Sequence, residues 1–126
     1  MRKSYLIILV SLILILNKNS HADYSQCLDY FNNGKFKDSF NECKDLALEG
    51  DTQAINLLAL MFYMGKGAKK DIHKAISLYK VSALNDNREA QFNLGIIYSR
   101  GVGVELNLFE AAFWFSLAGI EIEKSK

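Results

Sequence analysis

The chain has 126 residues and a net charge of +1 at pH 7, with 15 basic and 14 acidic side chains. This near balance excludes a nucleic-acid-binding protein of the usual kind, because such proteins carry a basic stripe or patch. Half of the residues are hydrophobic and none is proline. This composition is typical of a protein built from helices around a buried core.

Residues 1–22 have the features of a secretory signal peptide. A charged start precedes an apolar run over 5–16, and Ser20 and Ala22 supply small residues at positions −3 and −1 of a cleavage site. The run is shorter than the roughly 20 residues that a membrane-spanning helix needs. We predict cleavage after Ala22 and export to the periplasm or out of the cell, without stable membrane insertion; an uncleaved anchor is the alternative. Cleavage removes three basic residues, which leaves one domain of about 104 residues with a net charge of −2.

The mature chain begins with a predicted helical hairpin that contains both cysteines. Helices over 24–33 and 36–49 flank the turn around Gly34. Cys27 lies about two helical turns before this turn and Cys43 about two turns after it, so antiparallel helices bring them to similar heights. Export would place them in an oxidising compartment, and we therefore predict a disulfide. The alternative is a pair of buried free thiols, and two cysteines alone do not form a zinc site.

Two segments after the hairpin repeat each other at a spacing of 36 residues. The first copy consists of Ala54, Leu58, Ala59, Phe62, Gly65, Gly67, Asp71, Ala75, Leu78, Tyr79, Ser82 and Ala83. The second consists of Ala90, Leu94, Gly95, Tyr98, Gly101, Gly103, Asn107, Ala111, Trp114, Phe115, Ala118 and Gly119. Apolar residues recur at steps of three and four, which predicts helices over 51–64, 71–85, 87–100 and 107–120.

A Gly-x-Gly sequence separates the two predicted helices of each copy. Gly65 and Gly101 stand where a helix C-cap favours the left-handed conformation. Asp71 and Asn107 stand at the N-cap of the helix that follows. The glycine pair lacks a third glycine, a preceding strand and a following Lys-Ser/Thr, so it does not predict a phosphate-binding loop.

These motifs resemble Sel1-like repeats, the bacterial relatives of tetratricopeptide repeats. The second copy shares with the family pattern Ala90, Leu94, Gly95, Tyr98, Gly101, Gly103, Val104, Ala111, Trp114 and Ala118, and departs from it at Asn107, Glu110 and Phe115. The first copy shares Ala54, Leu58, Gly65, Gly67, Asp71, Lys74, Ala75, Tyr79 and Ala83, and departs at Ala59, Phe62, Ala68, Leu78 and Asp86. The preceding segment resembles the hairpin that often opens such arrays, through Tyr30, Gly34, Phe36, Ser39, Ala47 and Gly50.

The resemblance covers about residues 24–120 and implies an all-α fold. The expected architecture is an α-solenoid of antiparallel helix pairs with about six helices in a right-handed superhelix. The expected divisions are a repeat domain over 23–120 and a frayed tail over 121–126, with the hairpin over 24–50, the first repeat over 51–86 and the second over 87–122. The resemblance further implies a role in protein–protein interaction, with no cofactor.

A candidate binding surface follows from the solenoid arrangement, in which the first helix of each unit lines the concave face. Eight residues on or beside that side of the helical wheel are the candidate binding residues: Asn56, Leu60, Tyr63, Met64, Glu89, Phe92, Ile96 and Arg100. They would form an apolar strip with polar edges, which suits a peptide or helix with periodic anchors. The alternative is that these residues pack against the adjacent repeat, and the sequence favours neither.

Motifs for chemistry are sparse. Ser77 and Lys80 have the Ser-x-x-Lys spacing of penicillin-recognising enzymes, and a few cysteine-rich members of the family have been described as such. An enzyme acting on β-lactams or cell-wall peptides is therefore one alternative, although no Ser-Asp-Asn or Lys-Thr-Gly motif accompanies the pair. His73 has no acid or cysteine at metal-ligand spacing. We predict a non-enzymatic interaction module of a bacterial envelope or secretome; a periplasmic chaperone or inhibitor is a further alternative.

The last predicted helix is crowded with large apolar side chains. These are Phe109, Phe113, Trp114, Phe115 and Leu117. Some of them must face the core. We expect the others to form an exposed edge that forms a homodimer or docks a partner protein.

Overall fold

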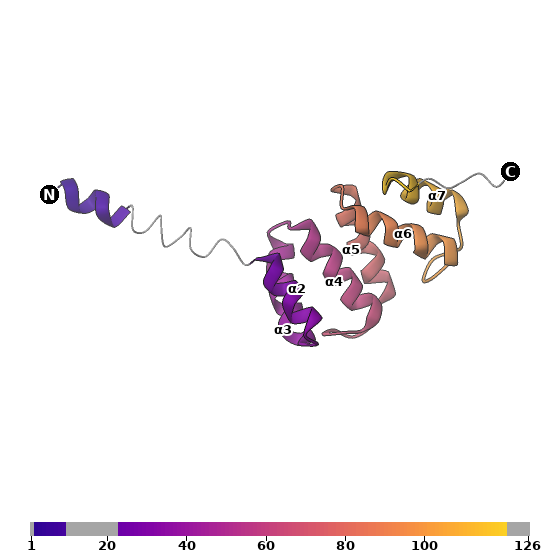
Figure 1. Cartoon of the computed structure of the whole chain (residues 1–126), viewed down its shortest axis with the longest axis horizontal. Coiled ribbons are helices and arrows are strands. Elements are labelled where there is room, and N and C mark those ends of the chain that lie inside the picture. The colour runs from indigo at the N-terminus through magenta and orange to yellow at the C-terminus, as the bar shows by residue number, and fades with distance from the viewer. Residues whose placement is uncertain (1, 10–22, 121–126) are drawn as a thin grey trace.

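The computed structural model describes residues 2–9 and 23–120. A short helix covers 2–9, and six further helices form the folded body (Figure 1). They are α2 (Tyr24–Asn32), α3 (Phe36–Leu48), α4 (Thr52–Met64), α5 (Ile72–Leu84), α6 (Arg88–Arg100) and α7 (Leu108–Leu117). No strand occurs in these described ranges, so the predicted all-α fold is confirmed. The predicted cleavage site after Ala22 and the tail over 121–126 lie outside the described residues.

The helices begin and end at the residues that local chemistry favours. Asp71 caps α5, because its Oδ1 accepts a hydrogen bond from the backbone N–H of Lys74 at 3.0 Å. Gly65 and Gly101 end α4 and α6 in the left-handed conformation, with φ of 69° and 65°. Each side-chain cap stabilises a helix by about 1 kcal/mol. The capping residues of α4 to α7 are Asp51, Asp71, Asn87 and Asn107.

The last helix is shorter than the prediction of 107–120, because α7 ends at Leu117. Gly119 adopts a left-handed conformation with φ of 71°. The backbone N–H of Ile120 then donates to the carbonyl oxygen of Phe115 at 2.9 Å. A left-handed glycine closed by such a bond is a common end of a helix, so the closing glycine of the second repeat lies beyond the helix.

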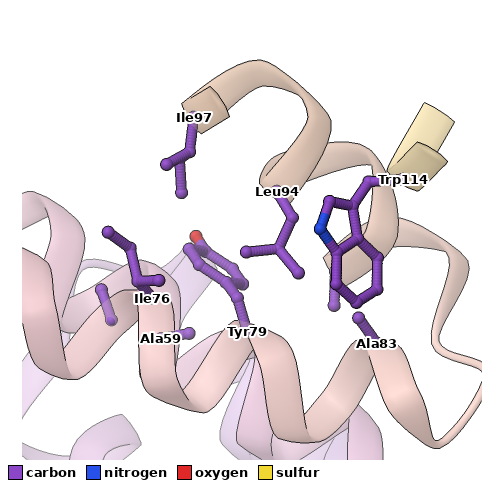
Figure 2. Packing of buried hydrophobic residues seen from close by; sticks show 9 residues of the cluster. Ala59, Ile76, Tyr79, Ala83, Leu94, Ile97 and Trp114 are labelled. Carbon is purple, nitrogen blue, oxygen red and sulfur yellow. The ribbon is translucent and has the colours of Figure 1, made fainter. Parts of the chain in front are cut away.

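The buried residues form a continuous seam along the array. Each helix packs against the next one along the chain, and α2 also packs against α4. One cluster joins α2, α3 and α4 through Cys27, Cys43, Leu46, Ala54, Leu57, Leu58 and Met61. A second joins α4 to α7 through Ala59, Ala75, Ile76, Tyr79, Ala83, Ala90, Leu94, Ile97 and Trp114 (Figure 2). Leu60 and Leu78 touch both clusters, so every unit is supported by its neighbour.

The second glycine of each Gly-x-Gly turn brings the loop close to the preceding unit. A Cβ atom on Gly67 would collide with the backbone carbonyl of Phe36 in α3. A Cβ atom on Gly103 would collide with the side chain of Ile72 in α5. Both glycines also have positive φ, which disfavours any other residue. The turns therefore let neighbouring units stack closely, in addition to reversing the chain.

A disulfide links α2 to α3. Cys27 and Cys43 are bonded, with Cα atoms 5.4 Å apart and a sequence separation of 16. This Cα distance lies inside the usual range for disulfides. Ser39, also fully buried, donates a hydrogen bond from Oγ to the carbonyl oxygen of Cys27 at 2.8 Å. The bond and this polar contact together fix how the two helices of the hairpin cross.

Candidate partner-binding site

The eight candidate residues lie on α4 and α6 at different depths. On α4, Asn56 is buried, Leu60 and Tyr63 are half-buried, and Met64 is exposed. On α6, Ile96 is half-buried, whereas Glu89, Phe92 and Arg100 are exposed. The middle of the strip therefore consists of half-buried, mostly apolar side chains, and exposed side chains surround them.

Four of the candidate residues meet at a hollow of about 210 Å³ between α4 and α6. This concave hollow is lined by Leu60, Tyr63, Tyr79, Asn93, Ile96, Ile97 and Arg100. Leu60, Ile96 and Ile97 are its purely apolar lining residues, and Asn93, the two tyrosines and Arg100 add groups that form hydrogen bonds. Such a mixture is typical of a pocket that orients a bound segment.

Three residues that line the concave hollow are not among the eight predicted from the sequence. Tyr79 comes from α5, the second helix of its unit, and rises toward α6 beside Ile76 and Leu94 (Figure 2). Ile97 and Asn93 flank Ile96 on α6. The repeat pattern marked Tyr79 as a core position, and a wheel drawn for α4 and α6 alone does not include α5.

Charge around the strip is unevenly distributed along α6. Burial raises the pKa of Tyr79, and the carboxylate of Glu89 acts in the same direction. Burial also raises the pKa of Tyr24, again with help from Glu89 and from Asp51. Glu89 in the first turn of α6 thus places negative charge near both phenols, which stay neutral donors at physiological pH. Arg100 in the last turn supplies the opposite charge.

Phe92 lies outside the concave hollow and packs toward α7. Its ring centroid is 5.7 Å from that of Phe115, with the planes tilted by 53°. Gly95 allows this arrangement, because a Cβ atom there would collide with the Phe115 ring. The strip predicted from the wheel is therefore divided between a hollow and an aromatic contact.

Asn56 has a buried amide oxygen that accepts no hydrogen bond from the described part of the chain. An unsatisfied buried acceptor costs about 1–3 kcal/mol. We expect Asn56→Leu, which replaces the amide with an apolar group of similar length, to raise the free energy of unfolding by about 1 kcal/mol in urea denaturation. Gln53→Leu on the exposed side of α4 is the control, with an expected change within about 0.5 kcal/mol. A destabilised Asn56→Leu protein would show that the amide is satisfied.

The Ser-x-x-Lys pair does not have the geometry of a nucleophile and its base. Ser77 donates from Oγ to the carbonyl oxygen of His73 at 3.0 Å, within its own helix. Lys80 extends instead toward α6, where its Nζ lies 5.8 Å from the centre of the Tyr98 ring. Among the described residues, no three His, Cys, Asp or Glu side chains gather as metal ligands. In the same ranges, no helix has the length and apolar character needed to cross a bilayer.

The repeat pattern can be compared with known families. The Sel1 repeat family model matches residues 52–87 and 88–119, more than half of the chain. The chain belongs to the Sel1 repeat family. The first match starts at the first residue of α4 and extends through α5, and the second starts at the first residue of α6 and extends through α7. The structural unit of helix, glycine turn and helix is therefore the Sel1 repeat itself.

Curated relatives of this Sel1 repeat chain are much longer proteins. The chain is 37% identical over 68 residues to DAP3-binding cell death enhancer 1 of Rattus norvegicus. It is 29% identical over 70 residues to the ERAD-associated E3 ubiquitin-protein ligase component HRD3B of Arabidopsis thaliana. These segments cover 54% and 56% of the chain but only 13% and 12% of the relatives.

Solved structures of Sel1 repeat proteins have the same fold. A Sel1 repeat protein from Oxalobacter formigenes matches with a TM-score of 0.64 and 29% identity, over 66% of this chain and 34% of that one. The protective antigen c5321 of uropathogenic Escherichia coli matches with a TM-score of 0.70 and 27% identity, over 76% of this chain and 21% of that one. The predicted α-solenoid is confirmed. Sel1 repeat proteins generally serve as non-enzymatic scaffolds for protein–protein interaction.

The second Sel1 repeat exposes a row of large apolar side chains on α7. Exposure is 91% for Phe109, 53% for Phe113 and 49% for Leu117, whereas Trp114 and Phe115 turn inward. At the 36-residue offset, the corresponding residues of the first repeat are His73, Ser77 and Val81. The homodimer expected through this helix stays a prediction.

Proposed function

We propose that this Sel1 repeat chain is an exported, non-enzymatic interaction module that binds a segment of a partner protein in the concave hollow. The observation that carries the proposal is the meeting of Leu60, Tyr63, Ile96 and Arg100 around one hollow between α4 and α6. A row of partly buried apolar side chains with hydrogen-bonding groups among them suits an inserted side chain of a peptide or helix. The scaffold role general to the family agrees with this proposal.

The charges at the two ends of α6 would set the direction in which the segment binds. Glu89 and Arg100 are eleven residues apart, which is about 16 Å along a helix. A segment that spans this distance would place a basic group near Glu89 and an acidic group near Arg100. Its apolar anchors would enter between Tyr63 and Ile96. Complementary end charges of this kind select the orientation and the partner more than they add affinity.

Export is part of the proposal and depends on the leader-like segment. The charged start, the apolar run and the small residues before Asp23 support it. A disulfide in the hairpin agrees with an oxidising compartment. Mass spectrometry of the protein produced with its own first 22 residues should give a chain that begins at Asp23. An intact chain in the cytosolic fraction would contradict this.

The hollow is tested with a photoreactive amino acid placed at Ile96 in cells of the source organism. We expect a discrete crosslinked adduct from this position, and we expect Arg100→Glu to reduce the adduct at least fivefold without changing the melting temperature. The control position is Leu106, which is 56% exposed and does not line the hollow. Equal crosslinking from Ile96 and Leu106, or indifference to Arg100→Glu, would contradict binding in the concave hollow.

A further inference from the structure

A larger hollow, about 490 Å³, opens on a different face of α4, between α3 and α5. This hollow is here called the α3–α5 groove. Leu58 and Phe62 of α4 form its floor, Phe40 lies on the α3 side and Leu78 on the α5 side. Leu60 and Tyr63 point to the concave hollow instead, so α4 separates two surfaces that a partner could occupy independently.

The α3–α5 groove lies where the first repeat departs from the second. At the 36-residue offset, Leu78 corresponds to Trp114 and Lys74 corresponds to Glu110. In the second repeat the Trp114 side chain is buried, and its Nε1 donates to the carboxylate of Glu110 at 3.2 Å. In the first repeat Leu78 and Lys74 both line the groove. The first repeat therefore lacks the indole and the carboxylate with which the second repeat fills the equivalent place.

The rim of the α3–α5 groove carries positive charge. Lys44 and Lys74 line it, both exposed, and none of its lining residues is acidic. The Nζ of Lys74 lies 4.6 Å from the centre of the Phe62 ring, so the ammonium group is held over the floor by a cation–π contact. An apolar floor below two lysines complements a ligand that combines a large apolar group with a carboxylate.

We propose that the α3–α5 groove binds a helical segment of a partner protein that inserts a tryptophan or phenylalanine and presents a glutamate one turn before it. The segment would supply from outside the pair that Trp114 and Glu110 supply within the second repeat, with the glutamate now facing Lys44 and Lys74. Residues four apart lie on one face of a helix, so a Glu-x-x-x-Trp spacing can reach the rim and the floor together. This surface is separate from the concave hollow, and the proposal does not rest on that function.

The probe is a fluorescein-labelled helical peptide of about 15 residues with one central Glu-x-x-x-Trp pair, titrated against the mature protein by fluorescence anisotropy. We expect saturable binding that is lost when the peptide tryptophan is replaced by alanine and weakened at least tenfold when its glutamate is replaced by lysine. Leu78→Trp, which gives the first repeat the residue of the second, should fill the groove and weaken binding at least tenfold.

A charge variant keeps the test independent of any repacking around Leu78. Lys44→Glu with Lys74→Glu changes only exposed side chains and should weaken binding at least tenfold. Loss of the Lys74–Phe62 contact, worth about 0.5–1 kcal/mol at an exposed site, should lower the melting temperature by no more than about 8 °C. Lys37→Glu with Lys80→Glu makes the same change of net charge outside the groove and should weaken binding less than threefold.

Two outcomes would overturn the proposal. The first is the absence of saturable peptide binding, and the second is equal binding by the Leu78→Trp protein. If peptide binding is absent and dodecanoate binds in a manner sensitive to Leu78→Trp, the groove is a site for a small amphiphile instead.

Discussion

Replacing Trp114 with alanine is expected to lower the free energy of unfolding by about 3–5 kcal/mol, the range for a buried large aromatic side chain. Trp114 is 5% exposed and belongs to the cluster that joins α4 to α7. It lies beside Leu94 and opposite Ala83, so its removal leaves a cavity where three helices meet (Figure 2). The hydrogen bond from Nε1 to Glu110 is lost as well. Urea denaturation followed by circular dichroism measures the change.

The matched control for Trp114 is its neighbour Phe113. The two rings touch edge to face, with centroids 5.1 Å apart, but Phe113 is 53% exposed. Phe113→Ala should therefore cost no more than about 1.5 kcal/mol, the upper value for an aromatic pair. Similar losses for both variants would show that burial of Trp114 is not what stabilises the second repeat. Trp114 is the sole tryptophan of the chain, so its fluorescence reports this core directly in the unmodified protein.

The helices could be predicted from the sequence because their signals are local. Asp71 and Asn107 cap the helices that they precede, and Gly65 and Gly101 end the helices that they follow. Each signal acts through hydrogen bonds or backbone angles within a few residues, so no tertiary information is needed. The sequence predicts the end of α7 three residues too late, because the predicted helix includes Gly119, whose left-handed conformation lies beyond the end of α7.

The depth of residues on α4 could not be predicted in the same way. Every residue from Ala54 to Ala59 is buried, since α4 packs against α2, α3 and α5. A helix covered on several sides has no single apolar face, and a wheel gives the direction of a side chain but not what covers it. Asn56 was therefore placed on an open strip, whereas the structure buries it.

The two hollows depend on contacts between helices that are distant in sequence. Tyr79 reaches the concave hollow from α5, and Phe40 reaches the α3–α5 groove from α3. The sequence did contain one clue to the groove, because Leu78 departs from the tryptophan of the repeat pattern. Leucine at this position preserves the helix, and its consequence for packing depends on how α3, α4 and α5 lie together.

Breaking the disulfide is expected to lower the free energy of unfolding by about 3 kcal/mol, the chain-entropy value for a loop of this length. Cys27 and Cys43 are fully buried and separated by 16 positions in sequence. For a domain of roughly 100 residues, this loss corresponds to a fall of about 12–24 °C in melting temperature. Thermal melts with and without a phosphine reductant measure it. The reductant should have no effect on a Cys27→Ser, Cys43→Ser protein, which should already melt at the lower temperature.

Loss of the disulfide should lower local stability more at the hairpin than in the rest of the array. Stability in a stack of repeats is approximately a sum of terms for each unit and for each interface between neighbours. The hairpin of α2 and α3 lies at one end of the stack, and within the folded body its neighbour beyond the pair is α4. Hydrogen exchange should therefore accelerate over residues 24–48 in the reduced protein, while α6 and α7 keep their protection. Uniform acceleration across the six helices of the folded body would instead show that the disulfide stabilises a single cooperative unit. An unchanged melting temperature would show that the hairpin stays folded without the disulfide.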